Sequence, residues 1–250
     1  MASLQRVAVI GMALVVFGAV PGAARAQGRA ASDQDLQAAV IRKLQDENLR
    51  RGNDPEVTVR NGTVTLTGQV RSLWEKEAAI EFTRKTRGVM TTISELTIVA
   101  AESDQAIADD LTARVLRYER YSIFDDISAT VRDGRVTLDG NITDMSKAND
   151  IRDLAARVRG VQALQNDLRL YPASQSDDRV RNALARQIFL NPGLLSYGTQ
   201  TNPSIHLVVA NGRVTLKGFV RSAQDRQEVE AIARGVPGVL TVSNQLQVAR

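Results

Sequence analysis

Only a few side chains in this 250-residue sequence have the chemistry of a catalytic site, and the strongest pair is a serine and a histidine. Ser196 lies in Gly193-Leu-Leu-Ser-Tyr-Gly198, whose G-x-x-S-x-G spacing has one residue more than the G-x-S-x-G turn that exposes a nucleophilic serine. His206 is the single histidine and therefore the only imidazole that could act as a base. It is out of phase with the apolar Ile205 and Leu207, which predicts a half-exposed position on a strand. A hydrolase remains an open hypothesis only if Ser196 and His206 lie within ~3.2 Å of each other.

Paired carboxylates are the second chemical feature, and they occur as Asp109-Asp110, Asp125-Asp126 and Asp177-Asp178. Adjacent carboxylates can bind metal ions or exchange protons. Two of the pairs fall on or near expected helix N-termini, where capping and the helix dipole explain acidic residues. We therefore interpret the pairs as caps and solvated loops. Because the sequence also has no cysteine and no G-x-G-x-x-G, P-loop or H-E-x-x-H motif, we expect no catalytic residue, no metal site and no cofactor.

The first 26 residues have the features of a secretory signal peptide. Arg6 supplies positive charge, Val7–Val20 is a 14-residue apolar run, and Ala24-Arg25-Ala26 fits the A-x-A cleavage pattern. The run is shorter than the ~20 residues that a membrane-spanning helix needs, and an uncleaved N-terminal anchor is the alternative. The absence of cysteine excludes the lipid-modified N-terminal cysteine of a lipoprotein. We expect an exported, periplasmic protein whose stability comes from packed cores.

Three gapless copies of one motif organise the rest of the chain. Each copy has an Asn-Gly or Asp-Gly pair followed by V-T-L-x-G-x-V/I. Such a pair is typical of a two-residue type I′ turn, since both turn positions need positive φ. A second glycine follows each turn glycine by 26 residues, so the repeating unit is a small domain and not a short solenoid period. The turn glycines are Gly62, Gly134 and Gly212.

Helix signals surround each hairpin. Ser32, Ser103 and Ser176 are each followed by aspartate, which is the N-cap pattern, and apolar residues recur four, eight and twelve positions later. A second amphipathic segment and a strand-like run follow each hairpin. The expected fold is α+β, with three tandem small domains, each α-β-β-α-β with two helices packed on a three-stranded mixed sheet. The third strand is expected to run parallel to the second, and the strand order is left open. We place these domains, called units 1, 2 and 3, at residues 33–101, 102–172 and 173–250.

These repeats resemble the BON domain (bacterial OsmY and nodulation). The resemblance covers roughly residues 33–248, and it is closest in unit 3, where Asn211-Gly-Arg-Val-Thr-Leu-Lys-Gly precedes Val236-Pro-Gly-Val239. It implies a non-enzymatic periplasmic domain, often in tandem, linked to osmotic stress, envelope integrity and phospholipid binding. The family has no catalytic motif to carry over. Because this sequence lacks the lipoprotein cysteine, it resembles the soluble periplasmic members.

Unit 3 differs from the other two in its charge and in one loop. Unit 1 has no net charge, unit 2 carries −3 and unit 3 carries +4. Unit 3 also has about five extra residues between its first helix and first strand, in an unusually apolar connection. Cations beside apolar side chains suit an interface with anionic lipid headgroups. The predicted lipid- or partner-binding residues are Arg179, Arg181, Arg186, Phe189, Leu194, Leu195 and Tyr197.

Alternatives stay open at these positions. The apolar connection could fold back on its own core, and the arginines could form a solvated face. Trp74 begins the second helix of unit 1 and is expected to be a packing anchor, with an interfacial aromatic as the alternative.

The leading functional hypothesis is an exported, non-enzymatic protein of the cell envelope that binds phospholipid or membrane surfaces weakly, in connection with envelope or osmotic stress. The alternative is a protein-interaction or chaperone-like periplasmic module. The expected partners are anionic phospholipid or envelope proteins, without a nucleic acid and without a small-molecule substrate. The oligomeric state is left open.

Overall fold

The computed structural model describes residues 32–49, 55–99, 102–200 and 203–249. The expected signal peptide, residues 1–26, lies outside these ranges. Within them, no helix is long and apolar enough to cross a bilayer.

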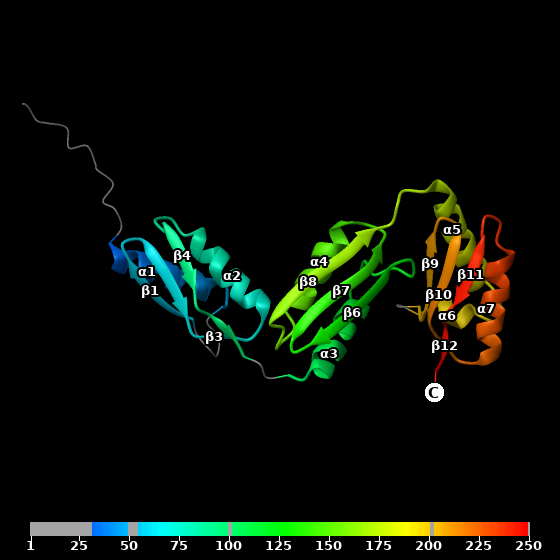
Figure 1. The fold of residues 1–250 in the computed structure, drawn as a ribbon, viewed down its shortest axis with the longest axis horizontal. Coiled ribbons are helices and arrows are strands. Elements are labelled where there is room, and N and C mark those ends of the chain that lie inside the picture. Colours follow the sequence, from blue (N-terminus) through cyan, green and yellow to red (C-terminus); the bar gives the residue numbers. More distant parts are fainter. Residues whose placement is uncertain (1–31, 50–54, 100–101, 201–202, 250) are drawn as a thin grey trace, which may run out of the picture.

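The described residues form three α+β units in the expected order of elements (Figure 1). Unit 1 contains α1 (Asp33–Asp46), β1 (Glu56–Arg60), β2 (Thr63–Thr67), β3 (Gln69–Val70), α2 (Leu73–Arg84), β4 (Thr91–Ser94) and β5 (Thr97–Ile98). Unit 2 contains α3 (Asp104–Leu116), β6 (Asp126–Arg132), β7 (Arg135–Ile142), α4 (Ser146–Ala156) and β8 (Ala163–Leu170). Unit 3 contains α5 (Gln175–Phe189), α6 (Leu195–Gly198), β9 (Ile205–Ala210), β10 (Arg213–Val220), α7 (Ala223–Gly235), β11 (Thr241–Asn244) and β12 (Gln247–Val248).

Each sheet is built around the predicted hairpin. The turn residues Asn61, Asp133 and Asn211 have φ of 49°, 50° and 51°, and the glycine after each also has positive φ, as the type I′ signature requires. On its other side, the second strand of each hairpin pairs with the strand that follows the second helix of the unit, which is β4, β8 or β11. This second pairing is parallel. The predicted parallel direction is therefore confirmed, and the strand order that the sequence left open is first, second, third in every unit.

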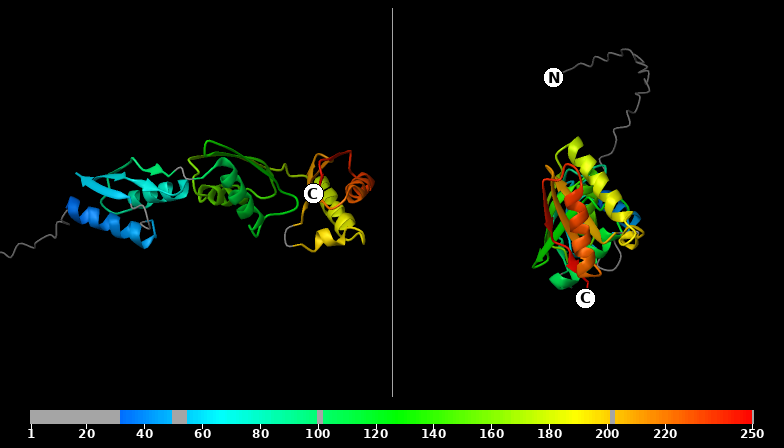
Figure 2. Two further views of the ribbon diagram at one scale, coloured as in Figure 1. Left: turned by 90° about the horizontal axis from the view of Figure 1, so that it is seen from below. Right: turned by 90° about the vertical axis from the view of Figure 1, so that its right-hand side faces the viewer.

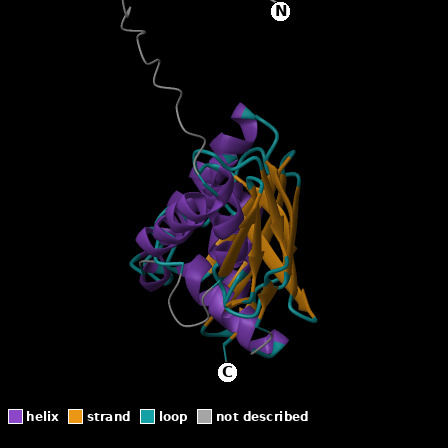
Figure 3. Ribbon diagram, turned by 90° about the vertical axis from the view of Figure 1, so that its left-hand side faces the viewer, coloured by secondary structure: helices purple, strands orange, loops and turns teal. Residues whose placement is uncertain are grey.

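Two helices cover one face of each sheet. The helices gather on one side of the molecule and the strands on the other when the three units are viewed in line (Figure 3). The predicted helix faces point into the cores, because Val40, Leu111 and Leu184 are 0–1% exposed. Each unit has its own cluster of buried apolar residues. The three units are therefore separate small domains, each with its own core.

An aspartate in the first turn of the first helix holds each hairpin turn. Its carboxylate accepts hydrogen bonds from both turn N–H groups, at 2.8 and 3.1 Å from Asp33, 2.8 and 2.9 Å from Asp104, and 2.7 and 2.8 Å from Asp177. Ser32 and Ser103 cap their helices as expected. The expectation for Ser176 is wrong, because α5 begins two residues earlier and Ser174 is its N-cap. Asp177 nevertheless binds its hairpin turn as Asp33 and Asp104 do. The Ser-Asp pairs of the three units are therefore equivalent at the aspartate but not at the serine.

Units 1 and 2 meet at a polar joint. The guanidinium of Arg152 on α4 bonds the carboxylate of Glu77 on α2 at 2.6 Å. Arg157, just after α4, stacks over the Trp74 ring with its central carbon 3.8 Å from the ring centroid. The amide of Gly160 donates to the carbonyl of Arg71 at 3.3 Å. Trp74 is therefore a packing anchor, as expected, and it packs against the next unit as well as its own core.

Removing the Arg157 guanidinium that stacks on the Trp74 ring gives a direct test of this joint. In Arg157→Ala, the fluorescence emission of Trp74, the single tryptophan, is expected to shift to longer wavelength because water replaces the stacked cation. Arg159→Ala, at an exposed position two residues later, is the control and should leave the spectrum unchanged. An unchanged spectrum in Arg157→Ala would show that units 1 and 2 are not docked in this way.

Unit 2 also contacts the sheet of unit 3, through the segment between α3 and β6. The amide of Leu207 on β9 donates to the carbonyl of Ile123 at 2.7 Å. Lys217 on β10 forms an ion pair with Asp126, with N–O distances of 2.7 and 2.9 Å. The three units thus form a row with unit 2 in the middle (Figure 1).

Candidate functional site

The apolar connection after α5 folds back on the core of unit 3, which is the alternative that the sequence left open. Leu194 and Tyr197 are 0% and 2% exposed. The hydroxyl of Tyr197 accepts from the backbone N–H of Arg221 at 2.7 Å and donates to Asp225. These two side chains therefore cannot reach a membrane surface or a partner. Phe189 is half-buried against the same core, and only Leu195 of the predicted apolar residues remains exposed.

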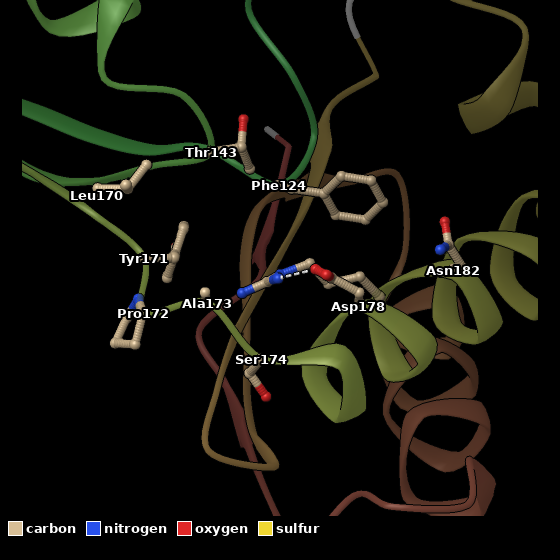
Figure 4. Close-up of a pocket in the computed structure, with 10 residues that line it drawn as sticks. Phe124, Thr143, Leu170, Tyr171, Pro172, Ala173, Ser174, Asp178 and Asn182 are labelled. Carbon is tan, nitrogen blue, oxygen red and sulfur yellow. Dashed lines mark hydrogen bonds and ion pairs between the residues drawn. The ribbon is translucent and has the colours of Figure 1, made fainter.

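Arg181 is also unavailable to a ligand at the surface. It is 7% exposed, and its guanidinium bonds the Asp178 carboxylate at 2.6 Å and the Val209 carbonyl at 2.7 Å. It also lies 4.8 Å from the ring centroid of Tyr171, in the linker between units 2 and 3. Arg181, Tyr171 and Asp178 line a cavity of about 430 Å³, with Tyr171 on one side and Asp178 on the other (Figure 4). Arg181 therefore fixes the linker to α5.

Arg179 and Arg186 are the predicted cations that stay at the surface. Both are exposed, and neither forms an ion pair within the described part of the chain. They lie seven residues apart on α5 and line an open groove of about 570 Å³ with Pro237 and Gly238, which follow α7. The two helices lie side by side in the right-hand view of Figure 2. Two cations thus face solvent in one shallow groove, which we call the α5 groove.

Two large, exposed apolar side chains follow the segments that line this groove, two residues after Gly238 and four residues after Arg186. Leu240 is 75% exposed and lies beside the turn glycine Gly212. Its sequence neighbour Thr241 pairs with Arg213, an exposed arginine without an ion pair among the described residues. Leu190, the C-cap of α5 and four residues after Arg186, is 69% exposed. The sequence analysis did not predict Leu240, Arg213 or Leu190 as site residues. The repeat does place Leu240 at a fixed distance from the turn glycine, but it does not show that the side chain is exposed.

The corresponding surfaces of the other units lack this combination. When α3 is aligned on α5 by its turn-binding aspartate, Arg179 and Arg186 correspond to Ala106 and Ala113 of unit 2. Leu240 corresponds to Gln162, whose side-chain amide instead donates to the Ile98 carbonyl of unit 1 at 3.3 Å. In unit 1, Arg179 corresponds to an aspartate of the capping box, Arg186 to the exposed Arg42 and Leu240 to an exposed methionine. Among the three units, only unit 3 therefore has an exposed arginine at both of these helix positions together with an exposed apolar side chain at the position of Leu240.

The serine and the histidine do not form a catalytic pair. Ser196 is exposed on α6, and no hydrogen bond joins it to His206, both of which belong to the described ranges. His206 is half-buried, as predicted, and its ring lies 5.1 Å from that of Tyr121 in unit 2. The geometry that the hydrolase hypothesis requires is absent.

The single histidine makes the joint between units 2 and 3 sensitive to pH. Burial lowers the pKa of His206 below its usual 6.5, although the nearby Asp125 and Asp126 oppose this shift. The unfolded chain therefore binds a proton more readily than the folded chain, and stability present above pH 6.5 is lost as the pH falls through the folded pKa. We expect an NMR titration of the imidazole to give a pKa below 6.5.

A variant isolates this effect. His206→Ser, which introduces the residue that unit 2 has at this register, should make the stability of unit 3 less dependent on pH between 7 and 5 in urea unfolding. An equal pH dependence in both proteins would contradict the assignment to His206.

The paired carboxylates are structural, but one of them is not solvated. Asp177 holds the turn of unit 3, as described above. The interpretation as solvated loops and caps is wrong for Asp125, which is 1% exposed and accepts from Lys147 Nζ at 2.7 Å and from the Thr143 backbone at 2.8 Å. A loop carboxylate enters the interior of unit 2 because a buried cation and backbone donors neutralise it there. Within the described ranges, no group of three or more His, Cys, Asp or Glu is arranged to hold a metal ion.

Comparison with known proteins identifies the units. The family described as BON domain matches the chain over residues 32–100, 103–172 and 176–250. The chain therefore belongs to the BON domain family, as its repeats predict.

One curated relative is osmotically-inducible protein Y of Escherichia coli (strain K12). It is 27% identical over 150 residues, which cover 57% of this chain and 74% of that protein. Two solved structures of CdsD, a structural protein of the type III secretion system of Chlamydia trachomatis, match at 16% and 17% identity and cover 86% of this chain and 98% and 94% of theirs. Both have a TM-score of 0.24, so we base no conclusion about this chain on this similarity.

Proposed function

We propose that this chain is a non-catalytic protein of the cell envelope that binds anionic phospholipid surfaces through the α5 groove of unit 3. The proposal rests on one observation, the two exposed arginines without an ion pair that line a groove whose segments continue to the exposed Leu240 and Leu190. Arginine matches phosphate geometry with two parallel donors. Exposed leucines beside such cations are suited to shallow insertion between headgroups.

The N-terminus and the family support a place of action in the cell envelope. The signal-peptide features of residues 1–26 support export, and we propose the periplasm as the compartment. The similarity to osmotically-inducible protein Y supports a role in osmotic or envelope stress. Binding is expected to be weak, because two or three cations contribute only ~1 kcal/mol each near an anionic surface.

Flotation with lipid vesicles tests this function. The intact chain should float with vesicles that contain phosphatidylglycerol and remain at the bottom of the gradient with vesicles of phosphatidylcholine alone. Added salt should reduce the floated fraction, since a headgroup interaction is screened over ~10 Å at 0.1 M ionic strength. Equal flotation with both vesicles, or none, would overturn the proposal and favour a protein-interaction module.

A further inference from the structure

A second cavity at the joint of units 2 and 3 lies away from the α5 groove. Its volume is about 400 Å³, which is the size of a small-molecule pocket, and it lies between domains, where such pockets are common. The outer face of the unit 3 sheet forms one side, and the end of α3 with the start of β6 forms the other. We call it the joint cavity, lined among others by Leu116, Tyr121, Ile127, Ser204, His206 and Phe219.

Two apolar side chains of the joint cavity stay exposed although the units are docked. Phe219 on β10 is 54% exposed, and Leu116 at the end of α3 is 41% exposed. At the position of Phe219, units 1 and 2 have Gln69 and Asn141, so only the unit whose sheet faces a neighbour has an aromatic there. Inter-unit packing alone does not explain a phenylalanine that is more than half exposed. An apolar ligand between Phe219 and Leu116 would cover it.

The three charged side chains that line the joint cavity are each in an ion pair, Asp125 with Lys147 and Asp126 with Lys217. Lys217 forms an ion pair through both oxygens of the Asp126 carboxylate. Burial raises the pKa of Tyr121 to about 12 and lowers that of His206, so both side chains are uncharged at neutral pH. The groups left for a ligand are then the Tyr121 hydroxyl and His206 Nε2, which form a long hydrogen bond of 3.5 Å with each other, and the Ser204 hydroxyl, which donates to the Phe219 carbonyl at 2.9 Å. Neutral donors and acceptors beside apolar walls match an uncharged ligand.

We propose that the joint cavity binds a small uncharged amphiphile, whose apolar body packs between Phe219 and Leu116 and whose hydrogen-bonding head faces Tyr121 and His206. Such a ligand touches two units and so stabilises their docked arrangement. This site is independent of phospholipid binding by the α5 groove.

Fluorescence of N-phenyl-1-naphthylamine, an uncharged aromatic amphiphile with one N–H donor, tests the proposal on the full chain. The probe should brighten with a saturable binding curve. Phe219→Gln, which introduces the residue of unit 1, should weaken binding by about tenfold, because one aromatic contact is lost. Met90→Gln, which introduces the residue of unit 2 at an exposed apolar position of unit 1, outside the cavity, is the matched control and should bind as well as the unchanged chain.

A competition experiment tests the charge of the ligand. Octan-1-ol should displace the probe at a lower concentration than octanoate, since both have the same chain length and differ in the charge of the head. Absence of saturable binding, equal binding in Phe219→Gln, or stronger displacement by octanoate would overturn the proposal. Vesicle flotation of Phe219→Gln should be unchanged, so failure of this inference is distinguishable from failure of the proposed function.

Discussion

Replacing Lys147 with methionine is expected to destabilise unit 2 by about 3–5 kcal/mol, because the carboxylate of Asp125 is then buried without its counter-charge. The side chains of Lys147 and Asp125 are 7% and 0% exposed, so water cannot replace the lost ammonium. Three of the other bonds to Asp125 come from the Ser122 backbone and from the backbone and hydroxyl of Thr143, and they remain in place around an unpaired charge. Hydrogen exchange of the β7 amides measures the effect in unit 2.

Two further variants separate burial of charge from loss of a side chain. Lys43→Met removes the lysine of an ion pair between Lys43 and Glu47, whose side chains are 44% and 36% exposed, and should change stability by less than about 1 kcal/mol. Adding Asp125→Asn to Lys147→Met should recover part of the lost stability, since no buried charge then remains. A small effect of Lys147→Met on its own would contradict a buried ion pair in unit 2.

Charge reversal in the α5 groove is expected to have the largest effect on binding. Arg179→Glu with Arg186→Glu changes the surface by four charges and should lower partition to vesicles that contain phosphatidylglycerol by about a thousandfold, at ~1 kcal/mol for each charge. Both side chains are exposed and form no ion pair within the described chain, and Arg179 Nε donates only to the Gln175 carbonyl of its own helix, at 3.3 Å, so the core of unit 3 does not depend on them. Vesicle titration followed by sedimentation measures the partition coefficient.

A matched reversal controls for net charge. Arg132→Glu with Arg135→Glu alters two exposed arginines beside the turn of unit 2 and changes the net charge of the chain by the same amount. Partition should then fall only slightly, because charges more than about 10 Å from the surface are screened at 0.1 M ionic strength. Equal losses in the two double variants would indicate a diffuse electrostatic attraction and no defined groove.

Local patterns predicted the fold of each unit because they act over a few residues. The Asn-Gly and Asp-Gly pairs fixed the turns, and apolar periodicity fixed the buried helix faces, as Leu111 and Leu184 illustrate. The strand order and the inter-unit contacts depend on residues far apart in the chain. Periodicity does not show that Arg157 stacks over Trp74, or that Asp126 meets Lys217.

The candidate site shows the same limit. The sequence correctly placed Arg179 and Arg186 at the surface of one helix, but hydrophobicity alone did not distinguish an exposed loop from one that covers its own core. Tyr197 is buried because its hydroxyl finds partners at the start of α7, which no local pattern indicates. Leu240 became part of the site only when the structure showed it exposed, two residues after Gly238 of the groove.

Site-specific labelling tests the central claim most directly, because the chain has no cysteine and a single introduced one is labelled cleanly. Leu240→Cys and Met90→Cys place an environment-sensitive fluorophore at equivalent, exposed positions of units 3 and 1. With vesicles that contain phosphatidylglycerol, the label at position 240 should shift to shorter wavelength as it enters the headgroup region, and the label at position 90 should not change. A shift at position 90 alone, or at neither position, would contradict membrane binding through unit 3.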